Sequence, residues 1–420
     1  MLAIQAASAP QHNARPTRIG LAVAGGGPLG GMYELGALRA LEEAVVGLAP
    51  TRLHVYVGVS SGAFIAAGLA NQLSMAEMCR IFLTGESHQA QFRPDLFVQP
   101  ALSEYLRRLW RIPGVLLEGA AEFARRPLHV SLSDNLGRLG RLLPTGLFDN
   151  QNIEAFLRDI FSREGRSNDF RTLTRKLYVI AVELDSGKAV RFGGAGHDAV
   201  PISRAIQASA ALPGLYPPVR IGDKLYVDGA LQRTLHASAA LDEGADLVIG
   251  INPLVPFDTA VAEGQGRRAS LAEGGLPAVL SQTFRALLQS RMQAGLSKYA
   301  HKYAAADIVL FEPNADDAQM FFSNVFSYDN RVEVAEHAYR TTRSDLYARR
   351  EALQPLLARH GLALDEAELQ QPRSLIAGLQ PAPARTTATT ARLRRAVAEL
   401  EETVAERLPR HSPAPRAARP

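Results

Sequence analysis

The chain has 420 residues, 47% of them hydrophobic and 21% charged, which is typical of a globular protein long enough to bury a large core. The net charge of +4 comes from the C-terminal end, because residues 371–420 hold nine Arg and four Glu, which leaves 37 basic and 38 acidic residues elsewhere. A body this close to neutral argues against a nucleic-acid partner. With Cys79 as its single cysteine, the chain cannot form an intramolecular disulfide or a cysteine-based metal site.

Residues 1–16 lack the basic segment and apolar core of a secretory signal, and we expect them to be a disordered leader. The longest apolar run, residues 57–70, is too short to cross a membrane. Together with the absence of disulfides, these features predict a cytoplasmic protein, to which peripheral membrane contact is a second expectation.

A buried strand is predicted over residues 17–24, followed by Gly25, Gly26 and Gly27 and then by a helix that includes Gly30. Backbone amides that converge in such a loop can hold an oxyanion or a phosphate. The Gly-Lys-Ser/Thr of a P-loop is absent and no acidic residue ends the next strand, which disfavours nucleotide binding. A tight turn that simply needs glycine is the remaining alternative.

The next strand ends in the sequence Gly58-Val59-Ser60-Ser61-Gly62, which an apolar helical stretch follows. A strand, a sharp turn and a helix in this order form a nucleophile elbow, in which small residues on either side leave a serine exposed. Ser60 is therefore the candidate nucleophile. A chance Gly/Ser turn between a core strand and a core helix is the alternative for this motif taken alone.

Residues 91–150 interrupt the alternation of strands and helices. Amphipathic helical patterns rich in Leu and Arg run through residues 103–126 and are broken by Pro113 and Gly114. We expect residues 91–150 to be a helical cap over the site, with a basic and apolar face that contacts a lipid interface. An ordinary helical layer with its Arg side chains in water is the alternative.

A second group of chemical interest follows a predicted helix over residues 202–211 and a turn of small residues and prolines over residues 209–218. A strand over residues 224–227 ends in Asp228, Gly229 and Ala230. An acid at the end of a strand places a carboxylate at the edge of the sheet where ligands bind in open α/β folds. A solvent-facing turn is the alternative.

The remaining pattern continues an α/β protein. Strands are predicted over residues 176–185, 189–192, 245–253 and 305–311, and helices over residues 152–161, 278–303 and 331–360. Residues 371–420 read as a linker rich in Pro, Ala and Arg with a short amphipathic helical tail. The oligomeric state is left open.

Four segments carry the chemistry predicted so far: the Gly25–Gly27 loop with Gly30, the Gly58–Gly62 elbow, residues 208–218 and the Asp228-Gly229-Ala230 motif. Together they resemble the patatin-like family of lipid acyl hydrolases. The resemblance covers residues 17–255. It implies a three-layer α/β/α sandwich over residues 17–330, with residues 91–150 as the helical cap insertion and residues 331–370 as a helical extension.

The family resemblance also implies a Ser/Asp catalytic unit without histidine, and ester hydrolysis by such a pair needs no metal or cofactor. Ser60 would be the nucleophile, Asp228 its partner, and the amides of Gly25, Gly26 and Gly27 the oxyanion hole. The family usually has Arg or Lys directly before the last glycine of the loop, where this chain has Leu29. That departure removes a cation from beside the oxyanion loop.

The expected activity is hydrolysis of phospholipids or lysophospholipids, as in a phospholipase A, with a lipid ester as substrate. Membrane contact would use residues 91–126 or the basic tail. One alternative is a non-catalytic lipid-binding or membrane-scaffold protein, and another is an esterase of neutral glycerides, short-chain esters or polyester. A histidine base is also an alternative, with His236 or His301 as candidates, because α/β-hydrolases place their histidine after the acid.

Overall fold

The computed structural model describes most of the chain. The described residues are 1–8, 16–87, 90, 92–93, 95, 98–110, 112–114, 117, 144–263, 270–322, 329–379, 392, 395–397 and 399–400. Most of the predicted C-terminal tail and the central part of the predicted cap therefore lie outside the described residues.

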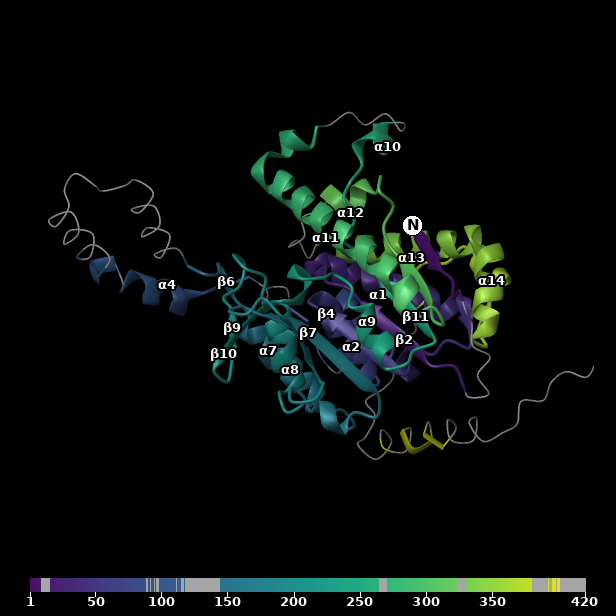
Figure 1. Cartoon of the computed structure of the whole chain (residues 1–420), viewed down its shortest axis with the longest axis horizontal. Helices are drawn as coiled ribbons and strands as arrows, with labels where there is room; N and C mark the ends of the chain where they lie inside the picture. Colours follow the sequence, from purple (N-terminus) through teal and green to yellow (C-terminus); the bar gives the residue numbers. More distant parts are fainter. Residues whose placement is uncertain are drawn as a thin grey trace, which may run out of the picture.

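A mixed sheet forms the centre of the molecule (Figure 1). Its strand order is β1-β12-β11-β2-β4-β7-β10-β9, and β8 also pairs with β7. Neighbouring strands are parallel from β12 to β7, which is the signature of strands joined by crossover helices. The parallel strands are β2 (Ile19–Val23), β4 (Val55–Val59), β7 (Lys176–Glu183), β11 (Leu247–Ile251) and β12 (Asp307–Phe311).

The remaining strands of this sheet are antiparallel to their neighbours. They are β1 (Leu2–Gln5), β8 (Ala189–Phe192), β9 (Val219–Ile221) and β10 (Lys224–Asp228). The expectation that residues 1–16 are disordered is wrong for residues 2–5, because these residues form β1. Leu2 is buried and pairs with Phe311 of β12, so the apolar start of the chain gains a core contact and a ladder of backbone hydrogen bonds.

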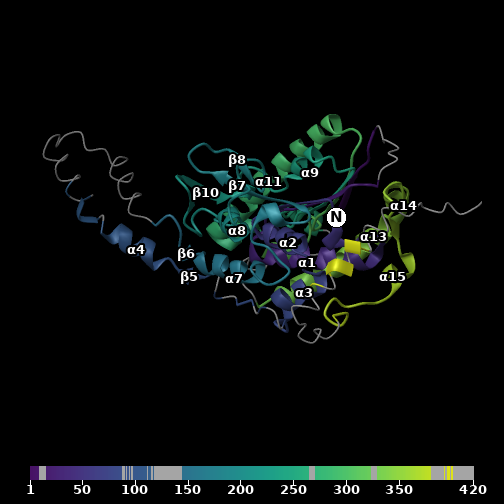
Figure 2. The same cartoon turned by 90° about the horizontal axis from the view of Figure 1, so that it is seen from below.

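Helices cover both faces of the sheet, as the expected three-layer arrangement requires (Figure 2). Alternation along β4 explains why both faces are apolar: Tyr56 packs into the core on one face, and Val55 and Val57 pack into the core on the other. One face carries α1 (Gly27–Ala44), α2 (Ser61–Ala70), α3 (Met75–Cys79), α7 (Gln151–Phe161), α8 (Ile202–Ser209) and α13 (Arg331–Ala348). The other face carries α9 (Ala237–Asp242) and α11 (Gly275–Lys302).

The C-terminal part of the described chain is helical and packs into the same core. Val334, Ala335 and Ala338 of α13 are buried against α1, and a Cβ on Gly36 of α1 would lie 2.1 Å from the carbonyl oxygen of Ala335. The two helices are therefore in close backbone contact. After α13 come α14 (Arg350–Arg359), β13 (Ala363–Leu364), which pairs with β3 (Val45–Val46), and α15 (Glu366–Gln370).

The structure describes only part of the expected cap over residues 91–150, so its placement over the site stays a prediction. The base of the cap is the pair of β5 (Gln99–Pro100) and β6 (Phe148–Asp149), from which α4 (Leu102–Leu109) projects away from the sheet (Figure 1). The Tyr105 hydroxyl of α4 donates to the carbonyl of Leu147, so α4 packs against the base of its own insertion. Residues 118–143 lie outside the description.

Short elements complete the chain, and none of the described helices is long and apolar enough to cross a membrane. They are α10 (Thr259–Glu263), α12 (Ala318–Phe322), a π-helical turn (Arg80–Thr84) and the 3₁₀ turns Pro50–Arg52, Phe170–Thr172, Gly229–Leu231 and Leu271–Gly274.

The turn between β4 and α2 brings backbones so close that side chains have no room. A Cβ on Gly58 would lie 2.4 Å from the Cα of Ala63, and a Cβ on Gly62 would lie 2.5 Å from the carbonyl oxygens of Val23 and Ala24. Backbone atoms of a buried strand cannot move aside as a flexible side chain can. Gly58 therefore allows the strand to approach the start of α2 within the elbow, and Gly62 allows the elbow to pack against the end of β2.

Substituting Gly62→Ala should destabilise the protein by about 3 kcal/mol or more, because the new methyl group overlaps the carbonyl oxygens of Val23, the last residue of β2, and of Ala24. Thermal unfolding measures the effect as a lower Tm. The control is Gly295→Ala inside α11, where the nearest atom would be 3.8 Å away and alanine is favoured by about 1 kcal/mol. An unchanged Tm for Gly62→Ala would show that the elbow is looser than described.

Candidate active site

A cavity of about 720 Å³ opens where the glycine loop and the elbow meet. Gly25–Gly27 follows β2, and Ser60 follows β4, and these two parallel strands are neighbours. Their carboxyl ends share one edge of the sheet, where ligands of α/β folds bind. The walls of the cavity are largely apolar and include Met32, Leu35, Ile65, Phe82, Phe92, Ile153, Leu212 and Leu215.

Ser60 lies at the floor of this cavity in a strained backbone conformation. Its φ is 50° and its ψ is −121°, an arrangement that costs a non-glycine residue about 1–3 kcal/mol. It directly precedes α2, whose N-terminal amides favour negative charge nearby. The amide of Ser60 donates to the Ser209 hydroxyl at 2.8 Å, and that hydroxyl donates to the Ile180 carbonyl. Ser209 thus ties the elbow to β7.

Asp228 reaches the same edge through strand register. It lies on an antiparallel strand, so the end of β10 would by itself point to the opposite edge. However, β7 extends beyond β4, and β10 runs back along that extension. Val59 pairs with Ile180 of β7, and the next residue, Ala181, pairs with Asp228. The amide of Asp228 also donates to the Ala211 carbonyl at 3.0 Å, which holds the strand end in place.

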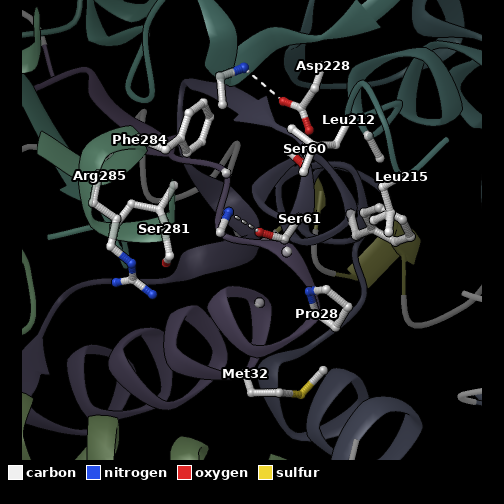
Figure 3. A pocket seen from close by; sticks show the side chains of 18 of the residues that line it. Pro28, Met32, Ser60, Ser61, Leu212, Leu215, Asp228, Ser281, Phe284 and Arg285 are labelled. Carbon is white, nitrogen blue, oxygen red and sulfur yellow. Dashed lines mark hydrogen bonds between the residues drawn. The ribbon is translucent and has the colours of Figure 1, made fainter. Parts of the chain in front are cut away.

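The hydroxyl of Ser60 donates directly to Asp228, with 2.6 Å between Oγ and Oδ2 (Figure 3). The other carboxylate oxygen, Oδ1, accepts the amide hydrogen of Ala230 at 2.8 Å, a bond that the turn beginning at Gly229 makes available. Asp228 is only 3% exposed, and burial raises the pKa of its carboxyl to about 6 despite these two hydrogen bonds. The carboxylate is therefore a stronger base than an exposed aspartate and is aimed at the hydroxyl proton.

The glycine loop lies directly against Ser60. A Cβ on Gly25 would be 2.8 Å from the Cβ of Ser60. In the first turn of α1, the Gly30 amide donates to the carbonyl of Gly26 at 3.1 Å. The Gly26 amide itself donates to the Ser61 hydroxyl at 2.9 Å. Of the three predicted oxyanion donors, Gly26 is therefore engaged, and Gly25 and Gly27 have no hydrogen-bond acceptor among the described residues.

The Ser61 hydroxyl that accepts from Gly26 in turn donates to Glu34 of α1, with 3.3 Å between Oγ and Oε1. Glu34 is fully buried, and the second oxygen of its carboxyl has no partner among the described residues. Burial raises the pKa of Glu34 well above its usual range, so its neutral form is favoured. Ser61, the residue after Ser60, thereby connects the glycine loop to a buried carboxyl.

Neither candidate histidine stands between Ser60 and Asp228, which are in direct contact. Burial lowers the pKa of His236 to about 3, and its Nε2 has no partner within the described part of the chain. His301 is exposed on α11, where its Nδ1 lies 3.0 Å from the carbonyl oxygen of Ser297. Across the described ranges, no group of three His, Cys, Asp or Glu could hold a metal ion.

Sequence reasoning missed several polar residues of the site. Ser61 was visible only as a spacer in the elbow, and Ser209 only as part of a turn of small residues. Glu34 carried a usable signal, because it is an acid among Met32, Tyr33 and Leu35 in an otherwise apolar helical stretch. Arg285 also lines the cavity, and nothing in the sequence of α11 links it to the elbow.

Comparison with known proteins gives one match to a family and several to structures. The model of the patatin-like phospholipase family matches residues 21–241. VipD from Legionella pneumophila is similar at 16% identity and a TM-score of 0.31, over 80% of this chain and 70% of VipD. Human GIVD cytosolic phospholipase A2, solved with methyl gamma-linolenyl fluorophosphonate, is similar at 12% identity and a TM-score of 0.30, over 80% of this chain and 59% of that chain. ExoU of Pseudomonas aeruginosa, solved in a heterodimeric complex with SpcU, is similar at 16% identity and a TM-score of 0.26, over 94% of this chain and 78% of that chain.

The family match spans the glycine loop, the elbow and the Asp228-Gly229-Ala230 motif, and it includes just over half of the chain. The resemblance inferred from those motifs is confirmed at the level of the family. The chain belongs to the patatin-like phospholipase family, a family of lipid hydrolases.

Proposed function

We propose that the protein is a serine acyl hydrolase that cleaves carboxylic ester bonds of phospholipids or lysophospholipids through Ser60 and Asp228. The observation that carries this proposal is the hydrogen bond of 2.6 Å from the Ser60 hydroxyl to a buried carboxylate, at the floor of an apolar cavity. A cavity of about 720 Å³ falls within the range that holds small-molecule ligands, and its apolar walls suit an acyl chain.

In the first half of the reaction, Asp228 takes the proton of Ser60 while Oγ bonds to the ester carbonyl carbon. The carbonyl oxygen becomes an oxyanion, for which the amides of Gly25 and Gly27 are the available donors. Each such donor typically contributes about 10²–10³ in rate. The intermediate then expels the alcohol, which takes the proton back from Asp228, and the acyl group stays on Ser60.

In the second half, water attacks the acyl-serine and gives a proton to Asp228. The carbon–oxygen bond to Ser60 breaks, the fatty acid leaves, and the proton returns to the serine oxygen. One carboxylate thus serves as base and acid in both halves. A neutral glyceride or short-chain ester could react in the same way, because the two catalytic groups touch only the ester.

Substituting Ser60→Ala should abolish ester hydrolysis and labelling by a fluorophosphonate, because the attacking oxygen is lost. Asp228→Asn should lower kcat by about 10²–10⁴-fold, the usual contribution of a general base. A panel of lipids and esters is assayed with both variants, and mass spectrometry locates the label. Exposed residues supply the controls, Ser297→Ala and Asp159→Asn, which should keep full activity.

Turnover retained in Ser60→Ala would refute the proposal. Substantial activity in Asp228→Asn would point to a histidine base instead. Liposome binding without acyl release by the wild type, across the whole panel, would favour the lipid-binding alternative.

The pH dependence of kcat/KM should report the raised pKa of Asp228. The carboxylate must be unprotonated to accept the serine proton, so activity should fall about tenfold per pH unit below about 6. If the base were an exposed aspartate, the fall in activity would begin near pH 4 instead. The profile is measured with a soluble ester, with circular dichroism at each pH as a check on folding. A flat profile down to pH 4.5 would contradict the role of Asp228.

We further propose that α4 contacts the membrane surface that supplies the substrate. Leu102, Leu106 and Trp110 recur at four-residue spacing, which places them on one side of the helix. Their exposed fractions are 66%, 57% and 84%, so this apolar face has little protein against it. Amphipathic helices of this kind bury their apolar face among lipid headgroups, with Trp favoured at that depth.

Replacing both Leu106 and Trp110 by Ser should weaken binding to phosphatidylcholine vesicles at least tenfold, because burial of each large side chain is worth about 1.5–3 kcal/mol. Co-sedimentation with vesicles measures the binding. Val46→Ser, at another exposed apolar position, is the control and should bind as the wild type does. Unchanged binding by the double variant would remove α4 from the proposed interface and leave the basic tail as the candidate.

A further inference from the structure

Arg285 places a buried positive charge in the wall of the cavity that holds Ser60. It lies on α11, outside the segment matched by the family model, and only 5% of it is exposed. Its guanidinium donates to the carbonyls of Val255 and Met320, at 3.2 and 3.4 Å, and lies 5.3 Å from the centre of the Phe321 ring. These contacts fix the side chain but bring no negative charge to it.

The charge of Arg285 has no ion-pair partner among the described residues. The acid with an electrostatic effect on it is Asp317, whose carboxylate already accepts from the amide of Met320 and bonds to His337. Burial lowers the pKa of Arg285 to about 10, which leaves it cationic at neutral pH. A buried charge without an ion-pair partner is costly, and an anion that entered the cavity would offset this cost.

The position of Arg285 in the cavity fits a ligand rather than the catalytic pair. Among the described residues that line the cavity, Arg285 and Asp228 are the only charged ones, and Asp228 is engaged with Ser60. One helical turn before Arg285, Ser281 lines the same wall, and Figure 3 shows the polar ends of both side chains pointing the same way. The glycine loop adds no cation, because Leu29 is apolar and buried.

We propose that Arg285 binds the phosphate of a phospholipid or lysophospholipid substrate, so that the site prefers phosphate-bearing lipid esters to uncharged glycerides. This inference rests on the proposed hydrolase function. A guanidinium matches the geometry of a phosphate and can donate two parallel hydrogen bonds to it, with Ser281 as an additional donor. The arrangement would hold the headgroup at the α11 wall while the acyl ester reaches Ser60.

The test compares two substrates with the same acyl chain, a lysophosphatidylcholine and a monoacylglycerol, below their critical micelle concentrations. Arg285→Gln should lower the ratio of kcat/KM between the first and the second by roughly 10–100-fold, mainly through KM, because a charge-assisted contact made before the chemical step is lost. Arg285→Lys keeps the charge without the fork of two donors and should lower the ratio by a smaller factor.

The control is Arg291→Gln on the same helix, where the exposed side chain donates to the carbonyl of Gln232 and does not line the cavity. Its ratio should equal that of the wild type. If Arg285→Gln does not fold, the ratio for Arg285→Lys decides. The proposal would be overturned if Arg285→Gln lowered kcat/KM equally for both substrates or left the ratio of the two values unchanged. It would also be overturned if the only effect of the substitution were on inhibition by the fatty-acid product. Failure of the wild type to hydrolyse either ester would instead overturn the proposed function.

Discussion

The hydrogen bond between Ser60 and Asp228 depends on the pairing of three strands. β4 ends at the serine, β7 continues past that end, and β10 returns along the continuation, so that two residues far apart in sequence meet at 2.6 Å. A shift of β10 by one residue would turn its side chains to the other face of the sheet and remove the carboxylate from the cavity. Ser209 and Ala211, which bond to the backbone of Ser60 and Asp228, fix this register from outside the strands.

Burial gives this pair its chemical character and also has a cost. A carboxylate at the apolar floor of a cavity is less stable in its charged form, and this makes it a stronger base toward the adjacent hydroxyl. The strained backbone of Ser60 is a second cost at the same place. Both costs are offset by the packing of the surrounding sheet and helices, whose apolar residues cover the two faces.

Local signals in the sequence were enough to predict the family, the α/β fold class and the positions of Ser60, Asp228 and the glycine loop at strand ends. These features depend on neighbours in sequence: glycines at a sharp turn, an apolar strand before them and an amphipathic helix after them. The family is confirmed, and the roles of the site residues remain predictions. Features that depend on distant pairing were not predictable, such as the antiparallel return of β10 and the approach of Arg285 from α11.

The predictions for residues 2–5 and for α4 show a different limit of reasoning from local sequence patterns. Residues 2–5 form a strand because β12 offers them an unpaired edge, which no local pattern reveals. The apolar residues of α4 were correctly read as amphipathic, yet amphipathicity alone does not say which surface the apolar face meets. In the described part of the insertion, Phe92 is the one residue that lines the cavity, and the exposed side of α4 lies elsewhere.

The link from Gly26 through Ser61 to Glu34 has an electrostatic consequence. In the proposed reaction, an ionised acid behind the glycine loop would repel the negative charge that forms on the carbonyl oxygen of the ester. Because Glu34 is held where its uncharged form is favoured, it can orient the loop without this repulsion. Burial thus removes the charge of this one acid from the surroundings of Ser60, so that it does not oppose the main-chain amides of the glycine loop.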